Sequence, residues 1–220
     1  MADAFTVMDC AILARTTGHE VQSLRELRDA LLKVEPQSIY YHFWGGLLRP
    51  TFDDPEFMND FAVWAGRELR DRTLAERLAM VDPATPPTME DLREELLDVV
   101  EARLDELDRP LWAGRDRQFN FLAAEITVIP TRYRIEDPHV LPEVLRQVSR
   151  GSLFYHFVDA RRRRDDGLDD LRAWLIGLDD EQFAPLIQQL AGVDPFQGSL
   201  ARLRAQLADA VARGLQEVAA

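Results

Sequence analysis

The chain has 220 residues, of which 46% are hydrophobic and 30% charged, a composition typical of a globular protein with a buried core. Its formal net charge of −13 argues against binding to nucleic acid or to an anionic membrane surface, because both carry negative charge themselves. The single cysteine, Cys10, excludes an internal disulfide and suits a reducing compartment.

The first residues do not read as a targeting segment. Residues 1–16 carry Asp3 and Asp9, and they lack the basic start and the unbroken apolar core of a secretory signal. No apolar run in the chain approaches the roughly 18 residues that are needed to span a bilayer. We therefore expect a soluble, cytoplasmic protein that associates with neither membranes nor nucleic acid.

The first predicted element is the apolar, β-prone segment FTVMDCAILART over residues 5–16, which fits either a strand pair or a buried helix. A helix follows, opened by a capping box of Ser23 and Glu26 and closed by Pro36. The next helix carries the motif SIYYHF, and we expect Ser38 to be its N-cap.

Three more helices are predicted in the first half of the chain. The first of them is expected to begin with Asp54 as N-cap and Pro55 in its first turn. A short helix follows, with Thr73 and Glu76 as a second capping box. The last is a strongly amphipathic helix over residues 92–107.

The second half of the chain repeats this order of elements. The motif SIYYHF at residues 38–43 returns as SLFYHF at residues 152–157, an offset of 114 residues. A second β-prone segment covers residues 119–131, and Asp137 with Pro138 opens the helix after it. Further collinear matches pair Trp64 with Trp174, VDP at 81–83 with VDP at 193–195, and LREELLDVVEARL at 92–104 with LRAQLADAVARGL at 203–215.

These matches predict an α+β, predominantly helical fold made of two repeats, residues 1–110 and 111–220, packed together as one globular unit. Each repeat would contain a short β-prone segment followed by about five helices. Two copies are too few for a solenoid. The expected arrangement is therefore a pseudo-two-fold, the intrachain version of a symmetric dimer.

The two motif helices carry the candidate site. Projected at 100° per residue, Tyr41 and His42 face away from the apolar side of the first helix, as do Tyr155, His156 and Asp159 in the second. In a structural interpretation, the two faces pack together near the pseudo-dyad and the histidines are hydrogen-bonded core residues. In a functional interpretation, the imidazoles meet there for proton chemistry or metal binding, with Asp159 orienting His156. Because two histidines fall short of a usual metal set, we expect neither a metal site nor a cofactor.

Two glycines, Gly45 and Gly46, directly follow the first motif. Each costs about 1 kcal/mol relative to alanine within a helix. We expect a close approach of another backbone or of a ligand to offset this cost.

A basic cluster after the second motif is a candidate anion-binding site, because guanidinium groups clamp phosphates and carboxylates. The alternative is a solvated helix end that is neutralised by Asp165 and Asp166. Cys10 has no neighbouring histidine and is expected to be a buried, inert thiol. The cluster consists of Arg161, Arg162, Arg163 and Arg164.

The segments DCAILART, LRELRDAL, SIYYHFWGGLLRPTFDDPEFMNDFAVWA and SLFYHFVDARRR resemble a bacterial and archaeal family that is classified as a domain of unknown function. The resemblance covers nearly the whole chain, and the SIYYHFWGGLLRP segment is its most distinctive part. It implies no catalytic residues. It does imply a loose association with sugar-nucleotide glycosyltransferases, and hence an accessory or regulatory role in carbohydrate metabolism.

The leading hypothesis is a non-catalytic binding or accessory module that docks a protein partner or a second copy of itself. One alternative is an enzyme, a hydrolase or phosphate-handling catalyst that uses the Tyr-His faces and the arginine cluster. Another is a sensor of a small ligand bound at the pseudo-dyad.

Overall fold

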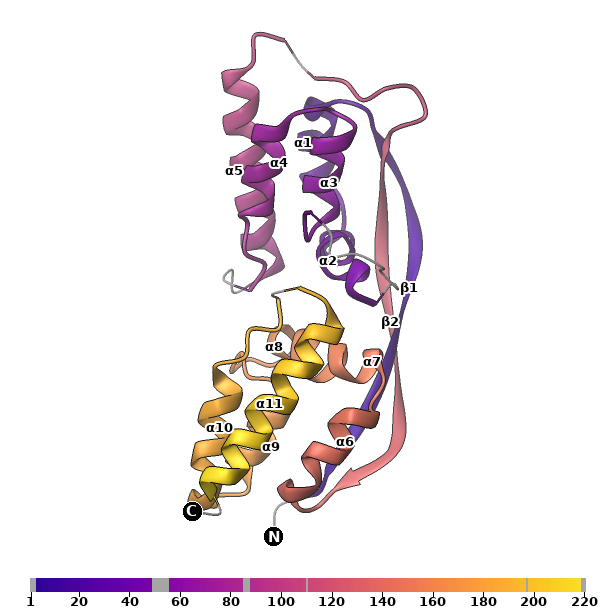
Figure 1. The fold of residues 1–220 in the computed structure, drawn as a ribbon. Coiled ribbons are helices and arrows are strands. Elements are labelled where there is room, and N and C mark those ends of the chain that lie inside the picture. Colours follow the sequence, from indigo (N-terminus) through magenta and orange to yellow (C-terminus); the bar gives the residue numbers. More distant parts are fainter. Residues whose placement is uncertain (1–2, 49–55, 85–87, 110, 197, 219–220) are drawn as a thin grey trace. The chain divides into compact units, whose positions relative to one another are not determined.

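The computed structural model describes residues 3–48, 56–84, 88–109, 111–196 and 198–218. The fold is α+β and mainly helical, as predicted (Figure 1). Both β-prone segments are strands: β1 (Phe5–Val21) and β2 (Phe119–Ile135) pair in a two-stranded sheet. This settles the choice between strand and helix that the sequence left open.

Helices follow each strand. After β1 come α1 (Leu24–Leu31), α2 (Pro36–Trp44), the 3₁₀ turn η1 (Gly45–Leu48), α3 (Asp60–Arg67), α4 (Arg72–Ala79) and α5 (Met89–Glu106). After β2 come the 3₁₀ turn η2 (Pro138–Val140), α6 (Leu141–Gln147), α7 (Arg150–Leu153), the π-helical turn η3 (Phe154–Asp159) and α8 (Ala160–Arg163). The chain continues with α9 (Asp170–Gly177), the 3₁₀ turn η4 (Glu181–Phe183), α10 (Ala184–Ala191) and α11 (Leu200–Val218).

The two strands are antiparallel. Thr17 on β1 donates its hydroxyl to the carbonyl of Phe121 at 2.7 Å, and Thr131 on β2 donates to that of Val7 at the same distance. Contact positions therefore descend along β1 as they ascend along β2. Strand formation is favoured by the β-branched and aromatic residues of both segments.

The chain divides into two compact units, and the division falls inside the strands. Unit 1 contains Met1–Ala11 and Thr127–Ala220, and unit 2 contains Ile12–Ile126. Each unit thus takes part of β1 and part of β2. The compact units are not separated at residue 110, the predicted boundary of the repeats, because each strand serves the helices of both halves.

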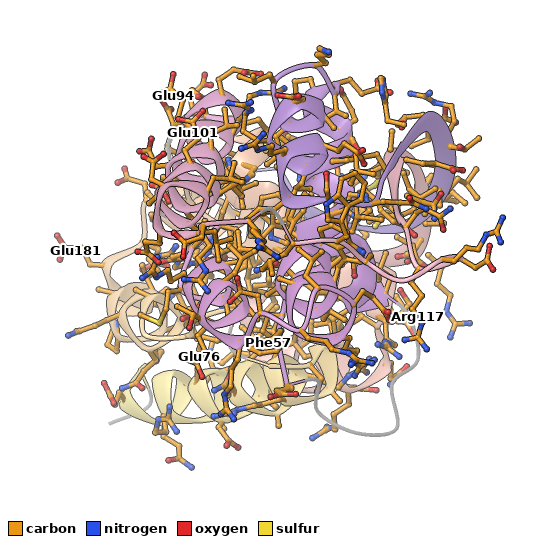
Figure 2. The ribbon with its side chains drawn as sticks, turned by 90° about the horizontal axis from the view of Figure 1, so that it is seen from above. Phe57, Glu76, Glu94, Glu101, Arg117 and Glu181 are labelled. Atoms are coloured by element: carbon orange, nitrogen blue, oxygen red, sulfur yellow. The ribbon has the colours of Figure 1, made fainter. Side chains whose placement is uncertain are left out.

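In unit 2, α1 packs on α5, and α4 packs on both α3 and α5. The buried face of α5 includes Leu92 and Leu96, which are fully buried. Arg93 is buried beside them and donates to the backbone carbonyls of Leu31 and Val34. The opposite face is acidic: Glu94 and Glu101 lie on the outer surface of the helix (Figure 2).

In unit 1, α10 and α11 pack closely because Gly214 has no side chain. A Cβ atom at this position would lie 2.5 Å from the Cα of Leu186 on α10. The close approach predicted for the glycines after the first motif does not occur there. A Cβ on Gly45 would meet the ring of Tyr41 on the preceding helix α2, and one on Gly46 would meet no atom within 4 Å.

Two of the predicted helix starts are confirmed. Ser23 caps α1, because its hydroxyl accepts from the backbone of Glu26 at 3.2 Å. The second bond of the predicted capping box is displaced by one residue, since the Glu26 carboxylate accepts from the backbone of Gln22 at 2.7 Å. Asp137 caps the turn that begins at Pro138, although this turn is 3₁₀ rather than α. Both signals depend only on neighbouring residues, so the sequence reveals them directly.

Other predicted starts are wrong. Helix α2 begins at Pro36, so Ser38 lies inside it rather than capping it. The matching serine of the second motif, Ser152, is not a cap either, because Ser149 caps α7. Helix α4 is capped by Asp71 instead of Thr73. The predicted cap Asp54, with Pro55, lies outside the described residues.

Candidate functional site

Helix α2 places His42 in the core of unit 2, where it is 4% exposed. Its Nδ1 lies 2.8 Å from the Asp60 carboxylate at the start of α3, and its Nε2 lies 3.0 Å from the backbone nitrogen of Leu122 on β2. Because the Leu122 N–H donates to Nε2, the ring proton is on Nδ1 and points to Asp60. Both ring nitrogens are therefore engaged within the unit.

Ser38 completes this arrangement. Its hydroxyl donates to the carbonyl of Leu122 at 2.9 Å. Residues four apart lie on one face of a helix, so Ser38 and His42 together meet both backbone groups of a single strand residue. A two-stranded sheet leaves such groups unpaired along its outer edges. Helix α2 thus takes the place of a third strand at this point.

Unit 1 repeats the histidine contacts. His156, on η3, has Nε2 2.8 Å from the backbone nitrogen of Met8 on β1 and Nδ1 2.8 Å from the Asp170 carboxylate at the start of α9. Met8 and Leu122 are 114 residues apart in the chain, as are His42 and His156. We call the His42 and His156 contacts the two strand clamps.

The carboxylate that orients His156 is Asp170, not Asp159 as predicted. Asp159 instead lies 3.2 Å from Arg163, which also donates to Asp170 at 2.8 Å. The Arg163 guanidinium sits over the ring of Tyr155, 4.2 Å from its centroid. The structure therefore joins Tyr155 and Asp159 directly to Arg163, and it joins His156 to Arg163 through Asp170.

The arginines of the cluster differ in their partners. Arg164 pairs with Asp166 at 2.6 Å, which is the neutralisation expected of a helix end, and Arg163 is held by Asp159 and Asp170. Arg164 also lies 3.9 Å from the Asp170 carboxylate, so Arg163 and Arg164 share this acceptor. Arg161 donates to the backbone carbonyl of Val193 at 3.0 Å. Arg162 is half-buried.

Burial and pairing shift several pKa values in this region. Burial alone would raise the pKa of Asp170, but hydrogen bonds from His156 and Arg163 outweigh it and lower that pKa. Burial also raises the pKa of Tyr155, partly opposed by the charge of Arg163. For Arg161, burial lowers the pKa. The Asp170 carboxylate is thus the charged acceptor of the cluster.

Cys10 lies buried on β1, in the same unit, and its thiol donates to the carbonyl of Gly151 at 3.3 Å. Burial, followed by the charges of Asp159 and Asp9, raises the pKa of this thiol to about 12. Since the thiolate is the nucleophilic form of cysteine, this geometry is that of an inert side chain.

Tyr41 is 4% exposed in unit 2, and its ring meets the His42 ring edge-on at a centroid distance of 5.4 Å. Two further aromatic rings pack against His42. Its ring lies 4.6 Å from that of Phe119 on β2 and 5.3 Å from that of Phe61 on α3. The surroundings of His42 are therefore mainly apolar.

Unit 1 has a cavity beside His156. It measures about 20 Å³, space for about one water molecule, and most of its lining residues are apolar. Val7 and Leu171 line it. At the matching positions of unit 2, 114 and 110 residues away in the chain, the buried side chains are Phe121 and Phe61. The smaller residues of unit 1 account for the space.

The aspartates of the two clamps were missed by sequence reasoning. A signal was available, because Asp60 and Asp170 each stand four residues before the matched tryptophans, Trp64 and Trp174. Both tryptophans also make matching bonds: Trp64 donates its indole N–H to the carbonyl of Arg117, and Trp174 to that of Asp3, each at 3.0 Å.

In the described parts of the chain, no group of three or more histidine, cysteine, aspartate or glutamate side chains is placed to hold a metal ion. None of the described helices is both long and apolar enough to cross a membrane.

Comparison with known proteins gave two matches. The model of a family of unknown function, DUF5752, matches residues 2–212. The solved structure of OrfY from Thermoproteus tenax is similar to this chain, with 27% sequence identity, a TM-score of 0.80 and 97% of each chain covered. No match was found among curated proteins.

Proposed function

The chain belongs to DUF5752, a family of unknown function, and we propose that it is a non-catalytic binding or accessory module that docks a partner protein. The observation that carries this proposal is the state of the two motif histidines. A general base needs a free ring nitrogen near its substrate. In His42 and His156, one nitrogen accepts from a strand backbone and the other is directed at an aspartate. The motif thus supports the strands.

We further propose that the two halves arose by internal duplication and are arranged as a pseudo-two-fold pair. This proposal is supported by matching hydrogen bonds as well as by the matching sequence motifs. The histidine, tryptophan and threonine bonds described above each have a counterpart 114 or 110 residues away, between atoms of the same kind. If the proposal holds, matched substitutions in the two halves should cost similar free energies of unfolding.

The partner that we favour is a carbohydrate-active enzyme. This choice rests on the resemblance of the motif segments to proteins found beside sugar-nucleotide glycosyltransferases. The acidic outer face of α5 offers a charged surface suited to a basic patch on such a partner.

Histidine substitutions separate the accessory role from an enzymatic one. Replacing His42 or His156 by alanine leaves a buried backbone N–H without its acceptor and removes a packed ring, which should cost roughly 2–5 kcal/mol. His19 is exposed on β1, so His19→Ala is the matched control and should stay within about 0.5 kcal/mol of the wild type. Unfolding in urea, followed by circular dichroism, measures all three.

The enzymatic alternative predicts a different result. It requires a His156→Ala variant that keeps its fold and stability while a turnover of the wild-type protein disappears. The accessory role is tested with tagged wild-type protein, which should retain a glycosyltransferase from its own cells at a fixed ratio. A wild-type monomer that turns over a substrate on its own would overturn the proposal.

A further inference from the structure

Each half of the chain binds the first part of the other half's strand. We define the N-half as residues 3–115 and the C-half as residues 116–218; the first contains β1 and the helices α1 to α5, the second contains β2 and the helices α6 to α11. The contacts already described run between the halves in both directions, and each lies inside one compact unit.

Helices of the N-half hold β2. His42 and Ser38 bind the two backbone groups of Leu122. Phe61 on α3 stacks on Phe119, with ring centroids 5.1 Å apart. These bonds and the Trp64 bond to the segment before β2 join the N-half to the first part of the C-half. Unit 2 is therefore incomplete without residues 117–126.

Helices of the C-half hold β1 in the same manner. His156 binds the backbone of Met8, and Trp174 binds the carbonyl of Asp3 while its ring lies 5.5 Å from that of Phe5. Gly151 on α7 lies so close to β1 that a Cβ atom there would stand 2.1 Å from the carbonyl oxygen of Cys10. Unit 1 is therefore incomplete without the first part of the N-half.

The covalent link between the halves adds little to this assembly. It passes through an exposed turn in which the N–H of Arg117 donates to the carbonyl of Gly114 at 3.2 Å, and the intervening Arg115 and Asp116 are also exposed. Exposed turns of this kind tolerate cleavage, and a cut between Arg115 and Asp116 leaves the Trp64 bond to Arg117 in place.

We propose that the N-half and the C-half are specific partners of each other, and that the folded chain stays assembled after this link is cut. The helices of each half bind the strand of the other half, so two separate sets of contacts hold the halves together. Separation requires that β1 leaves its clamp at His156 and that β2 leaves its clamp at His42. The inference stands on these contacts alone and does not depend on the proposed function.

The test uses the full chain with a protease site inserted between Arg115 and Asp116. The folded protein is cut to completion and analysed by native mass spectrometry and gel filtration at micromolar concentration. We expect one particle that contains both fragments in equal number and elutes with the uncut protein. Fragments that separate without denaturant would overturn the proposal. The uncut insertion variant is the control for the insertion itself.

If the first insertion prevents folding, the protease site is inserted instead between the exposed Asp108 and Arg109. It leaves residues 111–113 on the C-half, where their backbone bonds to Gln22 and Leu24 become a further contact between the fragments. Mixing isotopically labelled and unlabelled cut proteins then measures exchange. Each fragment should stay with its original partner for hours, because both strands must leave their clamps together. Formation of mixed labelled and unlabelled pairs within minutes would contradict the proposal that each half holds the strand of the other.

Discussion

Gly151 is the position at which adding a single methyl group should lower the stability of the fold most. It lies at the start of α7, where the helix backbone meets β1. A Cβ atom there would stand 2.1 Å from the backbone oxygen of Cys10 and 2.2 Å from the carboxylate of Asp9. Carbon atoms of this kind hardly ever approach another heavy atom within 3.0 Å. In Gly151→Ala, the strand must therefore move away by about 1 Å.

That movement disrupts three hydrogen bonds at once. They are the bond from Met8 to His156, the bond from the Cys10 thiol to residue 151, and the bond from Ser149 to Asp9 at 2.6 Å. Each is worth about 1 kcal/mol, and the strain of overpacking adds a further 1–3 kcal/mol. We expect Gly151→Ala to lower the free energy of unfolding by roughly 4–6 kcal/mol, a large part of the 5–15 kcal/mol typical of a folded protein.

Gly177→Ala is the matched control. Gly177 ends α9, and a Cβ atom there would meet nothing within 4 Å. Alanine at an open helical position should be neutral or stabilising by up to about 1 kcal/mol. Both variants are compared with the wild type by urea unfolding and by thermal denaturation, in which Gly151→Ala should melt on the order of 10 °C lower.

The result that refutes this reasoning is equally definite. If Gly151→Ala unfolds within about 0.5 kcal/mol of the wild type, then α7 does not lie against β1 at this distance. The strand clamp at His156 would then lose its geometric support as well, because the same approach of α7 to β1 sets the position of both.

Three further predictions follow from unit 1. Asp170 has a lowered pKa in the folded protein, so its ion pairs contribute stability above about pH 4 that is lost as the pH falls through this lowered value. In urea unfolding between pH 7 and pH 3, the free energy of unfolding should therefore fall more for the wild type than for Asp170→Asn. Parallel pH curves for the two proteins would contradict the pairing. With a pKa of about 12, Cys10 should react with a thiol reagent at pH 8 several hundredfold more slowly in the folded chain than in guanidinium, and equal rates would place the thiol in solvent. Leu171→Phe should fill the cavity and raise the free energy of unfolding by up to about 1 kcal/mol, whereas a loss above 1 kcal/mol would show that its walls cannot adjust.

Local signals were sufficient for much of the secondary structure. Ser23 and Asp137 cap the elements predicted for them, because a cap depends on residues within one turn of it. The error at Ser38 had a local cause too. Pro36 suits the first turn of a helix, and it begins α2 two residues before the serine rather than ending the helix before it.

The candidate site could not be predicted in the same way, because its partners are distant in the chain. One of the two interpretations made His42 a hydrogen-bonded core residue, but it did not identify the partners. The bond that His42 accepts from Leu122 joins positions 80 residues apart, and the bond that His156 accepts from Met8 joins positions 148 residues apart. Helical projection identifies the side of a helix on which a residue lies. It carries no information about which strand covers that side.

The glycines that stand out in the sequence differ from those that pack closely in the structure. Gly45 and Gly46 drew attention because they follow the motif as a pair, yet neither is approached by another backbone. Gly151 and Gly214 are single glycines within ordinary helical sequence, and both lie against a neighbouring backbone. The need for glycine arises from the distance between elements, which a one-dimensional pattern does not contain.

The division of each strand between two units determines the order in which the two cores can close while the protein is being synthesised. During synthesis the helices α1 to α5 leave the ribosome before β2 does, so the core of unit 2 cannot close until residues 117–126 have emerged. The first part of β1 waits longer, since η3 and α9, which bind it, are made after β2. Contacts so far apart in sequence form slowly and leave apolar surface exposed in the meantime. The nascent chain is consequently the form of this protein that most needs a chaperone.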